Sequence, residues 1–254
     1  MVGIKKKEMI EKDLGFVLRR FNFRETSVIA TIFTKKFGKI NGILKGFYTL
    51  KKEFTTSLEL FSLNEFIFYP TRGELWLISF ADLVQDYSFL RSSLEKNCVA
   101  SSFCKIVNKV VPLQEKSEKV FELIRLSFTY LKDFSPQKVF YIFLVKLLSL
   151  CGFKPEFSQC LICGGKIGKR DKVFFNVASG GLLCERCYRL KPGSQEISKQ
   201  AFLSILFFQN HSFSSSLKLG CSPWEEEILY VIKSFVSYHL TLPFFLLREV
   251  KIDS

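Results

Sequence analysis

The chain has few of the groups on which catalysis usually depends. Its 254 residues include only two histidines, His211 and His239, which lie in different sequence contexts. The sequence contains no Walker-type phosphate loop, no Gly-x-Ser-x-Gly motif and no spaced acidic set of the kind that holds the metal of a nuclease. We therefore expect a protein that is not an enzyme.

Long hydrophobic runs are also missing. The most apolar segment, VFYIFLVKLLSL, is interrupted by Lys146 and is too short to span a bilayer. The first residues, MVGIKKKEMIEKDLG, carry lysines but no apolar stretch behind them, which is unlike a signal peptide. These features predict a cytoplasmic protein without a membrane partner, in a reducing compartment where disulfides are rare.

Acidic residues are outnumbered, and the excess of positive charge is uneven. The chain has 37 Lys and Arg residues against 24 Asp and Glu residues, a net charge of +13. Residues 1–79 carry +6 and residues 151–195 carry +5, whereas residues 196–254 carry −1. Such a field favours a polyanionic partner, either nucleic acid or an anionic membrane surface. A basic protein from a lysine-rich proteome would show the same excess without such a partner.

The first eighty residues have the composition of β structure, rich in β-branched and aromatic side chains. In the third expected strand, Ile40 and Leu44 share one face, whereas Lys39, Asn41 and Lys45 share the other. Five strands with a longer connection after the third are typical of a small OB-type barrel. The expected strands are residues 15–23, 27–34, 39–46, 58–69 and 74–81.

From residue 83 onward the hydrophobic period becomes helical. The last helix has an N-terminal signature, with Ser222 as the expected N-cap, Pro223 in the first turn and Glu225 completing a capping box. The expected helices are residues 89–110, 118–131, 137–150, 199–209 and 225–240.

Two Cys-x-x-Cys pairs interrupt the helical part, in CLICGGKIGKRDKVFFNVASGGLLCERC. A reducing compartment disfavours a disulfide clamp, and a thioredoxin-like redox site needs a single pair at a helix start. Two residues between thiolates allow one tight turn to present both sulfurs to a tetrahedral ion. We therefore predict one structural zinc ion per chain in a four-cysteine ribbon, with VFFNVASGGLL forming two short strands. Its ligands are Cys160, Cys163, Cys184 and Cys187.

The predicted fold class is α+β, with a five-stranded OB-type barrel followed by a helical domain into which a zinc ribbon is inserted. The expected limits are residues 1–81 for the barrel and 158–195 for the ribbon. The two parts of the helical domain are residues 82–157 and 196–254.

Cations and aromatic rings are interleaved in the barrel sequence, as in proteins that bind single-stranded nucleic acid. Most of these rings are nevertheless expected to fill the barrel core. The candidate nucleic-acid-binding cations are Arg19, Arg20, Arg24, Lys35, Lys36 and Lys39, and the rings beside them are Phe16, Phe21, Phe23, Phe33 and Phe37.

Over nearly its full length the chain resembles the RecO family of bacterial recombination mediators. The resemblance rests on GFVLRRFNFRETSVIATIFTKKFGKINGILKG, SLELFSLNEFIFYPTRGELWLIS, LLSLCGFKPEFSQCLICGG and FNVASGGLLCERC, in this order and at these spacings. It implies an N-terminal OB domain and a helical domain with a zinc ribbon. It also adds Lys45, Lys51 and Lys52 to the candidate DNA contacts.

The resemblance further implies binding of single- and double-stranded DNA and annealing of complementary strands in DNA repair and recombination. With RecR, such a protein helps to load RecA onto DNA coated by single-strand binding protein, so it would be associated with the nucleoid. Two alternatives stay open: a zinc-ribbon, OB-fold RNA-binding protein of transcription or translation, and an enzyme that uses the thiolates in redox chemistry. Strand annealing would exclude the first, and one bound zinc per chain would exclude the second.

Overall fold

The structure is a computed structural model that describes residues 10–48, 58–71, 73–167 and 172–241. The chain forms two compact units, residues 1–122 and 123–254, and each is described by itself. No helix built from the described residues has both the length and the apolar character needed to cross a membrane.

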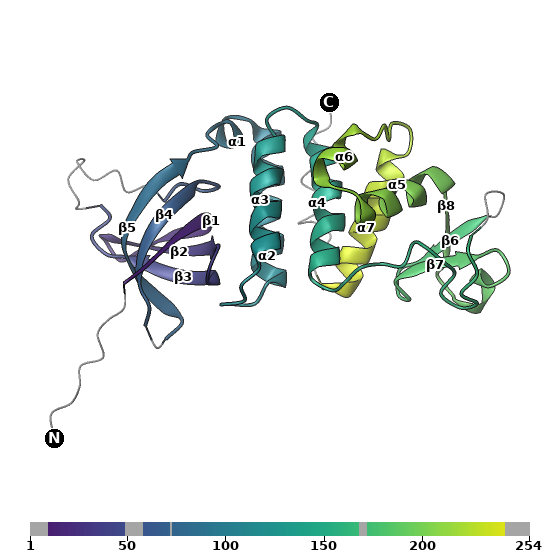
Figure 1. Ribbon diagram of the computed structural model, residues 1–254, viewed down its shortest axis with the longest axis horizontal. Coiled ribbons are helices and arrows are strands. Elements are labelled where there is room, and N and C mark those ends of the chain that lie inside the picture. Colours follow the sequence, from purple (N-terminus) through teal and green to yellow (C-terminus); the bar gives the residue numbers. More distant parts are fainter. Residues whose placement is uncertain (1–9, 49–57, 72, 168–171, 242–254) are drawn as a thin grey trace, which may run out of the picture. The chain divides into compact units, whose positions relative to one another are not determined.

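The first unit contains a closed five-stranded barrel (Figure 1). The strands follow the order β1-β2-β3-β5-β4, and every pair is antiparallel except β3 and β5, which are parallel. This arrangement confirms the predicted OB-type barrel. The strands are β1 (Glu11–Phe23), β2 (Ser27–Thr34), β3 (Gly38–Leu44), β4 (Leu63–Tyr69) and β5 (Leu75–Gln85).

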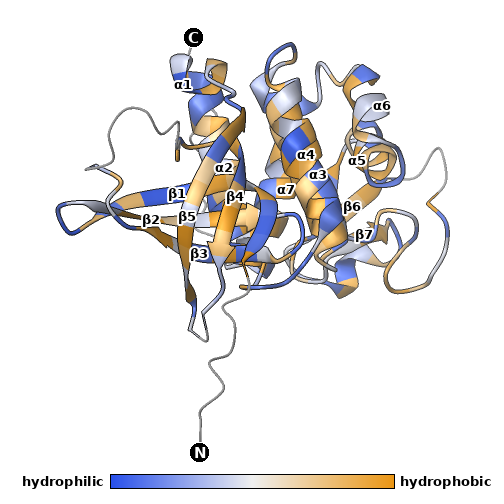
Figure 2. Cartoon of the chain, turned by 60° about the vertical axis from the view of Figure 1, so that its left-hand side comes forward, coloured by the Kyte–Doolittle hydropathy of each residue, from blue (hydrophilic) through white to orange (hydrophobic). Residues whose placement is uncertain are grey.

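Alternation along the strands fills the inside of the barrel. The residues of the barrel core are mainly branched or aromatic, and hydrophobic positions recur along the strands in Figure 2. Fully buried members of the core include Val17, Ile32, Phe66 and Phe68. Hydrophobic burial on this scale is the main contribution to the stability of the barrel.

The helix expected over residues 89–110 is two helices, α1 (Phe89–Ser92) and α2 (Leu94–Val110). Ser93 between them is extended, with φ −117° and ψ 123°, and its hydroxyl oxygen accepts a hydrogen bond from the backbone N–H of Lys96. Ser93 therefore caps α2 instead of continuing α1. Helix α3 (Glu118–Tyr130) begins in the first unit and ends in the second.

The second unit is built around α4 (Pro136–Leu150), which contacts three other helices. Ten residues of α4 are buried, among them Phe140, Tyr141 and Phe143, and this explains why its sequence is apolar on nearly every side. The surrounding helices are α5 (Lys199–Asn210), α6 (Phe213–Lys218) and α7 (Glu225–His239), of which α6 was not predicted.

The cysteine-containing segment forms a three-stranded antiparallel sheet in the order β7-β6-β8 (Figure 1). Strands β6 (Val173–Asn176) and β7 (Gly181–Cys184) are the two predicted around the Ala-Ser-Gly-Gly turn. Strand β8 (Gln195–Ile197) was not predicted, and a short 3₁₀ helix, η1 (Tyr188–Leu190), follows the second cysteine pair.

Lysine side chains satisfy carbonyl groups at several helix C termini. In the second unit, Lys146 on α4 donates to the carbonyl oxygens of Phe208 and His211 at the end of α5. Lys138, on the same helix, donates to the carbonyl of Leu219, the C-cap of α6, over 2.7 Å. A cation at a helix C terminus is favourable because unpaired carbonyls and the helix dipole concentrate negative potential there.

Candidate metal centre and nucleic-acid interface

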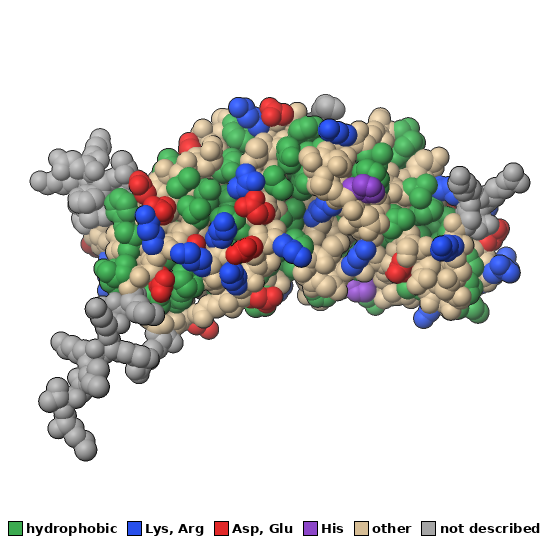
Figure 3. Space-filling model, in the orientation of Figure 1, with side chains coloured by type: hydrophobic (Ala, Val, Ile, Leu, Met, Phe, Trp, Pro, Cys, Tyr) green, Lys and Arg blue, Asp and Glu red, His purple; other side chains and the backbone are tan. Residues whose placement is uncertain are grey.

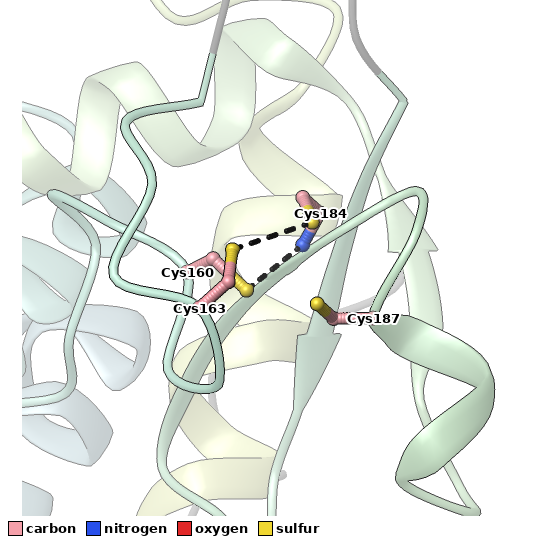
Figure 4. A group of neighbouring side chains, drawn as sticks. All are labelled: Cys160, Cys163, Cys184 and Cys187. Atoms are coloured by element: carbon pink, nitrogen blue, oxygen red, sulfur yellow. Dashed lines mark hydrogen bonds between the residues drawn. The ribbon is translucent and has the colours of Figure 1, made fainter.

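The four predicted cysteine ligands come together at one edge of the ribbon (Figure 4). Their sulfur atoms all lie within 4.8 Å of one another, and the Sγ atoms of Cys163 and Cys184 are 3.9 Å apart. A tetrahedral zinc ion with Zn–S bonds of about 2.3 Å requires sulfurs about 3.8 Å apart. The cluster therefore has the dimensions of a four-thiolate metal site. These residues are Cys160, Cys163, Cys184 and Cys187.

Tight turns hold each cysteine pair. The N–H of Gly164 donates to the carbonyl of Cys160 over 2.9 Å, and Gly164 has a φ of +67°, which glycine adopts without strain. In the second pair, the N–H of Cys187 donates to the carbonyl of Cys184 over 3.0 Å. The N–H of Cys184 also points to the sulfur of Cys160 at 3.5 Å, so backbone donors surround the thiolates.

The thiol pKa values reflect this environment. Burial by itself would raise the pKa of Cys160, but hydrogen bonds from Cys163, Cys184 and Ile162 lower it to about 6. The side chain of Cys184, together with burial, raises the pKa of Cys187 to about 12. Because the sulfurs lie close together, ionisation of one thiol raises the pKa of its neighbours. A bound cation would offset this repulsion, since it favours the thiolate form of every cysteine. With four protein ligands, such a centre has no open position for a substrate.

The ribbon is fixed to the helices of the second unit by aromatic contacts. The rings of Phe157 and Phe175 stack with centroids 5.2 Å apart and an interplanar angle of 4°. Phe175 also contacts Phe235 on α7, and the imidazole Nε2 of His239 lies 2.7 Å from the carbonyl oxygen of Val177. His239 thus contacts the turn that joins β6 and β7.

The structure distributes the candidate DNA-binding cations over three regions of the barrel. Arg24, in the β1–β2 turn, and Lys45, after β3, are exposed at one end of β2. Lys35 and Lys36, in the β2–β3 turn, are exposed at the other end. Arg19 is exposed on the strand face between these ends. Lys51 and Lys52 lie outside the described residues.

Arg19 and Arg20 are neighbours in sequence but face opposite sides of β1, as consecutive strand residues do. The guanidinium of Arg20 donates to the carbonyl of Leu58 over 3.2 Å and to the carboxylate of Glu59 over 3.0 Å. The ammonium group of Lys36 donates to the carbonyl of Lys12 over 2.9 Å. Arg20 and Lys36 therefore have partners within the barrel.

Among the candidates that the structure describes, Lys39 is the one that is buried. Its side chain is only 7% exposed, and its ammonium group donates to the carbonyl of Asn108 on α2. The expectation that Lys39 lies on a solvent-facing side of β3 was therefore wrong. The segment after α2 passes beside β3: Leu113 pairs with Lys39, and the N–H of Gln114 donates to the Lys39 carbonyl over 2.7 Å.

Beside this segment the barrel surface is hollowed into a recess of about 430 Å³. Phe21 is 44% exposed there, and the guanidinium of Arg19 lies 5.6 Å from the centre of its ring. Of the five rings interleaved with cations, Phe16 and Phe33 are completely buried, Phe23 and Phe37 are half-buried, and Phe21 is exposed. The recess is lined by Arg19, Phe21, Ile29, Thr31, Lys39, Asn41, Glu74, Leu75, Asn108 and Leu113.

Sequence reasoning missed the polar members of the recess because they are far apart along the chain. Thr31, Asn41 and Glu74 belong to different strands or turns and form no motif. The strand register brings them together: Thr31 lies opposite both Arg19 and Asn41, and Asn41 lies opposite Leu75. On the face seen in Figure 3, Lys and Arg side chains are interspersed with Asp and Glu, so the basic excess does not form one continuous patch there.

The fold and the site define a class: an OB-type barrel joined to helices that carry a four-cysteine ribbon. Residues 9–87 match the family model described as "Recombination protein O N terminal", and residues 91–246 match "Recombination protein O C terminal". The chain belongs to the RecO family of DNA repair proteins, as its sequence motifs predict.

Relatives named "DNA repair protein RecO" cover most of the chain. The protein from Caldicellulosiruptor saccharolyticus is 27% identical over 242 residues, 95% of each chain. The one from Acetivibrio thermocellus is 27% identical over 206 residues, 80% of this chain and 81% of its own. The one from Halalkalibacterium halodurans is 25% identical over 229 residues, 90% of this chain and 87% of its own.

Proposed function

We propose that the protein is a recombination mediator that binds single- and double-stranded DNA and anneals complementary strands. The observation that carries this proposal is the exposed ring of Phe21 beside Arg19 on a barrel whose turns present Arg24, Lys35 and Lys45. Cations track phosphates and an exposed ring offers a stacking surface, which together suit an unpaired strand. Membership of the RecO family supports DNA rather than RNA as the ligand.

We further propose that the four cysteines hold one structural zinc ion. The sulfur spacing and the closed ligand set support zinc over metals that keep open coordination positions. Cys160, Cys163, Cys184 and Cys187 would supply four thiolates, and the ion would lock the two turns against β6. The metal supplies no chemistry to a substrate, and the protein is not an enzyme in this proposal.

The partners belong to the same proposal. The protein acts with RecR to help load RecA onto DNA covered by single-strand binding protein, in the cytoplasm at the nucleoid. The division into a barrel (1–81), a ribbon (158–195) and two helical segments (82–157 and 196–254) also stays a prediction.

Annealing requires no nucleotide hydrolysis in this proposal. A cationic surface offsets the repulsion between two phosphate backbones, and base pairing supplies the free energy. The test mixes complementary strands at low salt with saturating protein, with and without a coat of single-strand binding protein and with and without RecR. We expect faster annealing on naked strands, insensitivity to nucleotide analogues and slowing at high salt. Annealing no faster than in protein-free mixtures would refute the mediator function and favour the RNA-binding alternative.

A further inference from the structure

We propose that the barrel recess holds one unpaired base of single-stranded DNA, stacked on Phe21, and that the barrel thereby distinguishes single strands from duplex. The inference rests on the proposed DNA-binding function and adds to it the form of DNA that this site selects. It follows from how two adjacent rows of side chains cross the strands that border the recess.

One row is apolar. The strand register places Ile29 opposite Phe21 on one side and opposite Ile43 on the other, and Ile43 opposite Leu77. None of these four side chains is completely buried: Phe21 is 44% exposed, and the other three are half-buried. The row forms an apolar strip across β1, β2, β3 and β5, and its members Phe21 and Ile29 line the recess. An exposed aromatic ring in such a strip is a surface on which a base can stack.

The other row is polar and offers both a donor and an acceptor. The hydroxyl of Thr31 donates to Oδ1 of Asn41 over 2.9 Å, which fixes the amide and leaves its N–H groups for a ligand. The exposed carboxylate of Glu74, next to Leu75 in the recess, is an acceptor. The edge of a base carries complementary acceptors and donors. In a duplex these groups are paired and the faces are stacked, so only an unpaired base can use this row.

Charge within the recess sets the orientation of the strand. Arg19 borders the apolar strip, whereas Glu74 lies beyond the polar row and repels phosphate. The phosphate therefore belongs on the Arg19 side, with the base directed toward Asn41 and Glu74. The guanidinium of Arg19, 5.6 Å from the Phe21 ring centre, covers the face that a base would take. On binding, Arg19 would give up this cation–π contact for a phosphate.

Size and surroundings favour a nucleotide over a peptide. A volume of about 430 Å³ lies within the range of small-ligand sites, about 300–1,000 Å³. Among the described residues, every barrel strand pairs with a neighbour on each side over part of its length, which disfavours the addition of an extended peptide as a further strand. Glu74 also disfavours an acidic peptide.

The test compares three probes of equal length at one salt concentration: a single strand, the same strand built from tetrahydrofuran abasic residues, and a duplex. The abasic strand keeps the phosphates and lacks the bases. With wild-type protein we expect about 10-fold weaker binding of the abasic strand, since stacking is lost. Phe21→Ala should weaken single-strand binding about 5- to 100-fold and leave the abasic strand and duplex nearly unchanged.

Two further variants test whether misfolding, rather than loss of the ring, explains the effect of Phe21→Ala. Phe21→Trp keeps a stacking ring, so it should retain affinity, and its additional tryptophan emission should be quenched by the single strand but not by the abasic one. Leu94→Ala is the matched control, because Leu94 is 72% exposed and lies on α2 outside the recess. Equal binding of the base-bearing and abasic strands by wild type, or an equal effect of Phe21→Ala on all probes, would overturn the base site while leaving DNA binding intact. Failure of wild type to bind any probe would instead refute the proposed function.

Discussion

The ammonium group of Lys39 donates to the carbonyl oxygen of Asn108, which the helix itself leaves unpaired. In a continuing helix, the N–H four residues later would bind this carbonyl, but that residue is Pro112, which has no N–H. Lys39 on β3 therefore caps the C terminus of α2 from the barrel. Its charge contributes to the attachment of this helix to the barrel.

Replacement of Lys39 by methionine should therefore lower stability more than DNA affinity. The variant leaves the Asn108 carbonyl without its charged donor, and we expect a loss of roughly 1–3 kcal/mol in the free energy of unfolding. Urea denaturation measures this loss, and the salt dependence of DNA binding should be nearly unchanged. Lys35→Met, at an exposed turn, is the matched control and should show the reverse pattern. A larger loss of DNA affinity in Lys39→Met than in Lys35→Met would restore Lys39 as a phosphate contact.

The same contact predicts a pH dependence. Burial lowers the pKa of the Lys39 ammonium group below that of a lysine in the unfolded chain. Between these two pKa values the unfolded state binds more protons, so the Lys39 contribution to stability rises as pH increases toward about 10.4. Below the folded-state pKa the cost of burying the charge is fully present. The difference in free energy of unfolding between wild type and Lys39→Met, measured at pH 7, 8, 9 and 10, should grow. A difference that falls over this range would contradict the sign of the shift.

The ribbon should contain one tightly held zinc ion per chain. Cys184→Ala removes one thiolate, and because site formation and local folding are coupled, zinc content should fall and β6 to β8 should become sensitive to protease. Cys98→Ala is the control, since Cys98 lies on α2 and is not a member of the cluster. Elemental analysis of reduced protein purified without chelator makes the measurement. A metal-free wild type with a protease-resistant ribbon would show that the four thiols fold without a metal.

DNA binding should depend on the exposed cations of the barrel. Combined replacement of Arg19, Arg24 and Lys35 by glutamine should weaken binding to all sequences about equally. The slope of log K against log salt should become shallower by about 0.7 per lost contact on single strands. A matched pair in the second unit, Lys154→Gln with Lys218→Gln, should leave this slope unchanged. Titrations at several salt concentrations measure this slope. An unchanged slope in the barrel variant would place the phosphate contacts elsewhere.

Local patterns were sufficient where each element depends on its own residues. The strand limits of β2 agree at both ends, because eight consecutive residues there are β-branched, aromatic or small. The cysteine pairs likewise gather as the spacing indicates, since a tight turn needs only its own residues. Both predictions, the limits of β2 and the gathering of the cysteines, depend on neighbouring residues in the chain rather than on distant partners.

Tertiary contacts explain what the sequence could not predict. Ser222 was expected to cap the last helix, but α7 begins at Glu225, and Trp224 is its N-cap without a side-chain hydrogen bond. Glu225 instead accepts from the hydroxyl of Tyr141, and Glu227 accepts from Ser198. The burial of Lys39 and the exposure of Phe21 are similar cases, because both are decided by the segment after α2 and by strand register rather than by neighbouring residues.

The closed barrel also constrains the order in which the chain can fold. Its closing seam pairs β1 with β4, joining Glu11 to Phe68 and Phe16 to Leu63, partners about 50 residues apart. Contacts at such separation require a large loop to close first, which slows folding, whereas the helices depend mainly on local contacts. During synthesis, β1 cannot find its last neighbour until β4 has emerged, and β4 in turn needs β5. The barrel is therefore expected to form only after its whole segment has left the ribosome. Until then, the side of β1 that pairs with β4 has no partner.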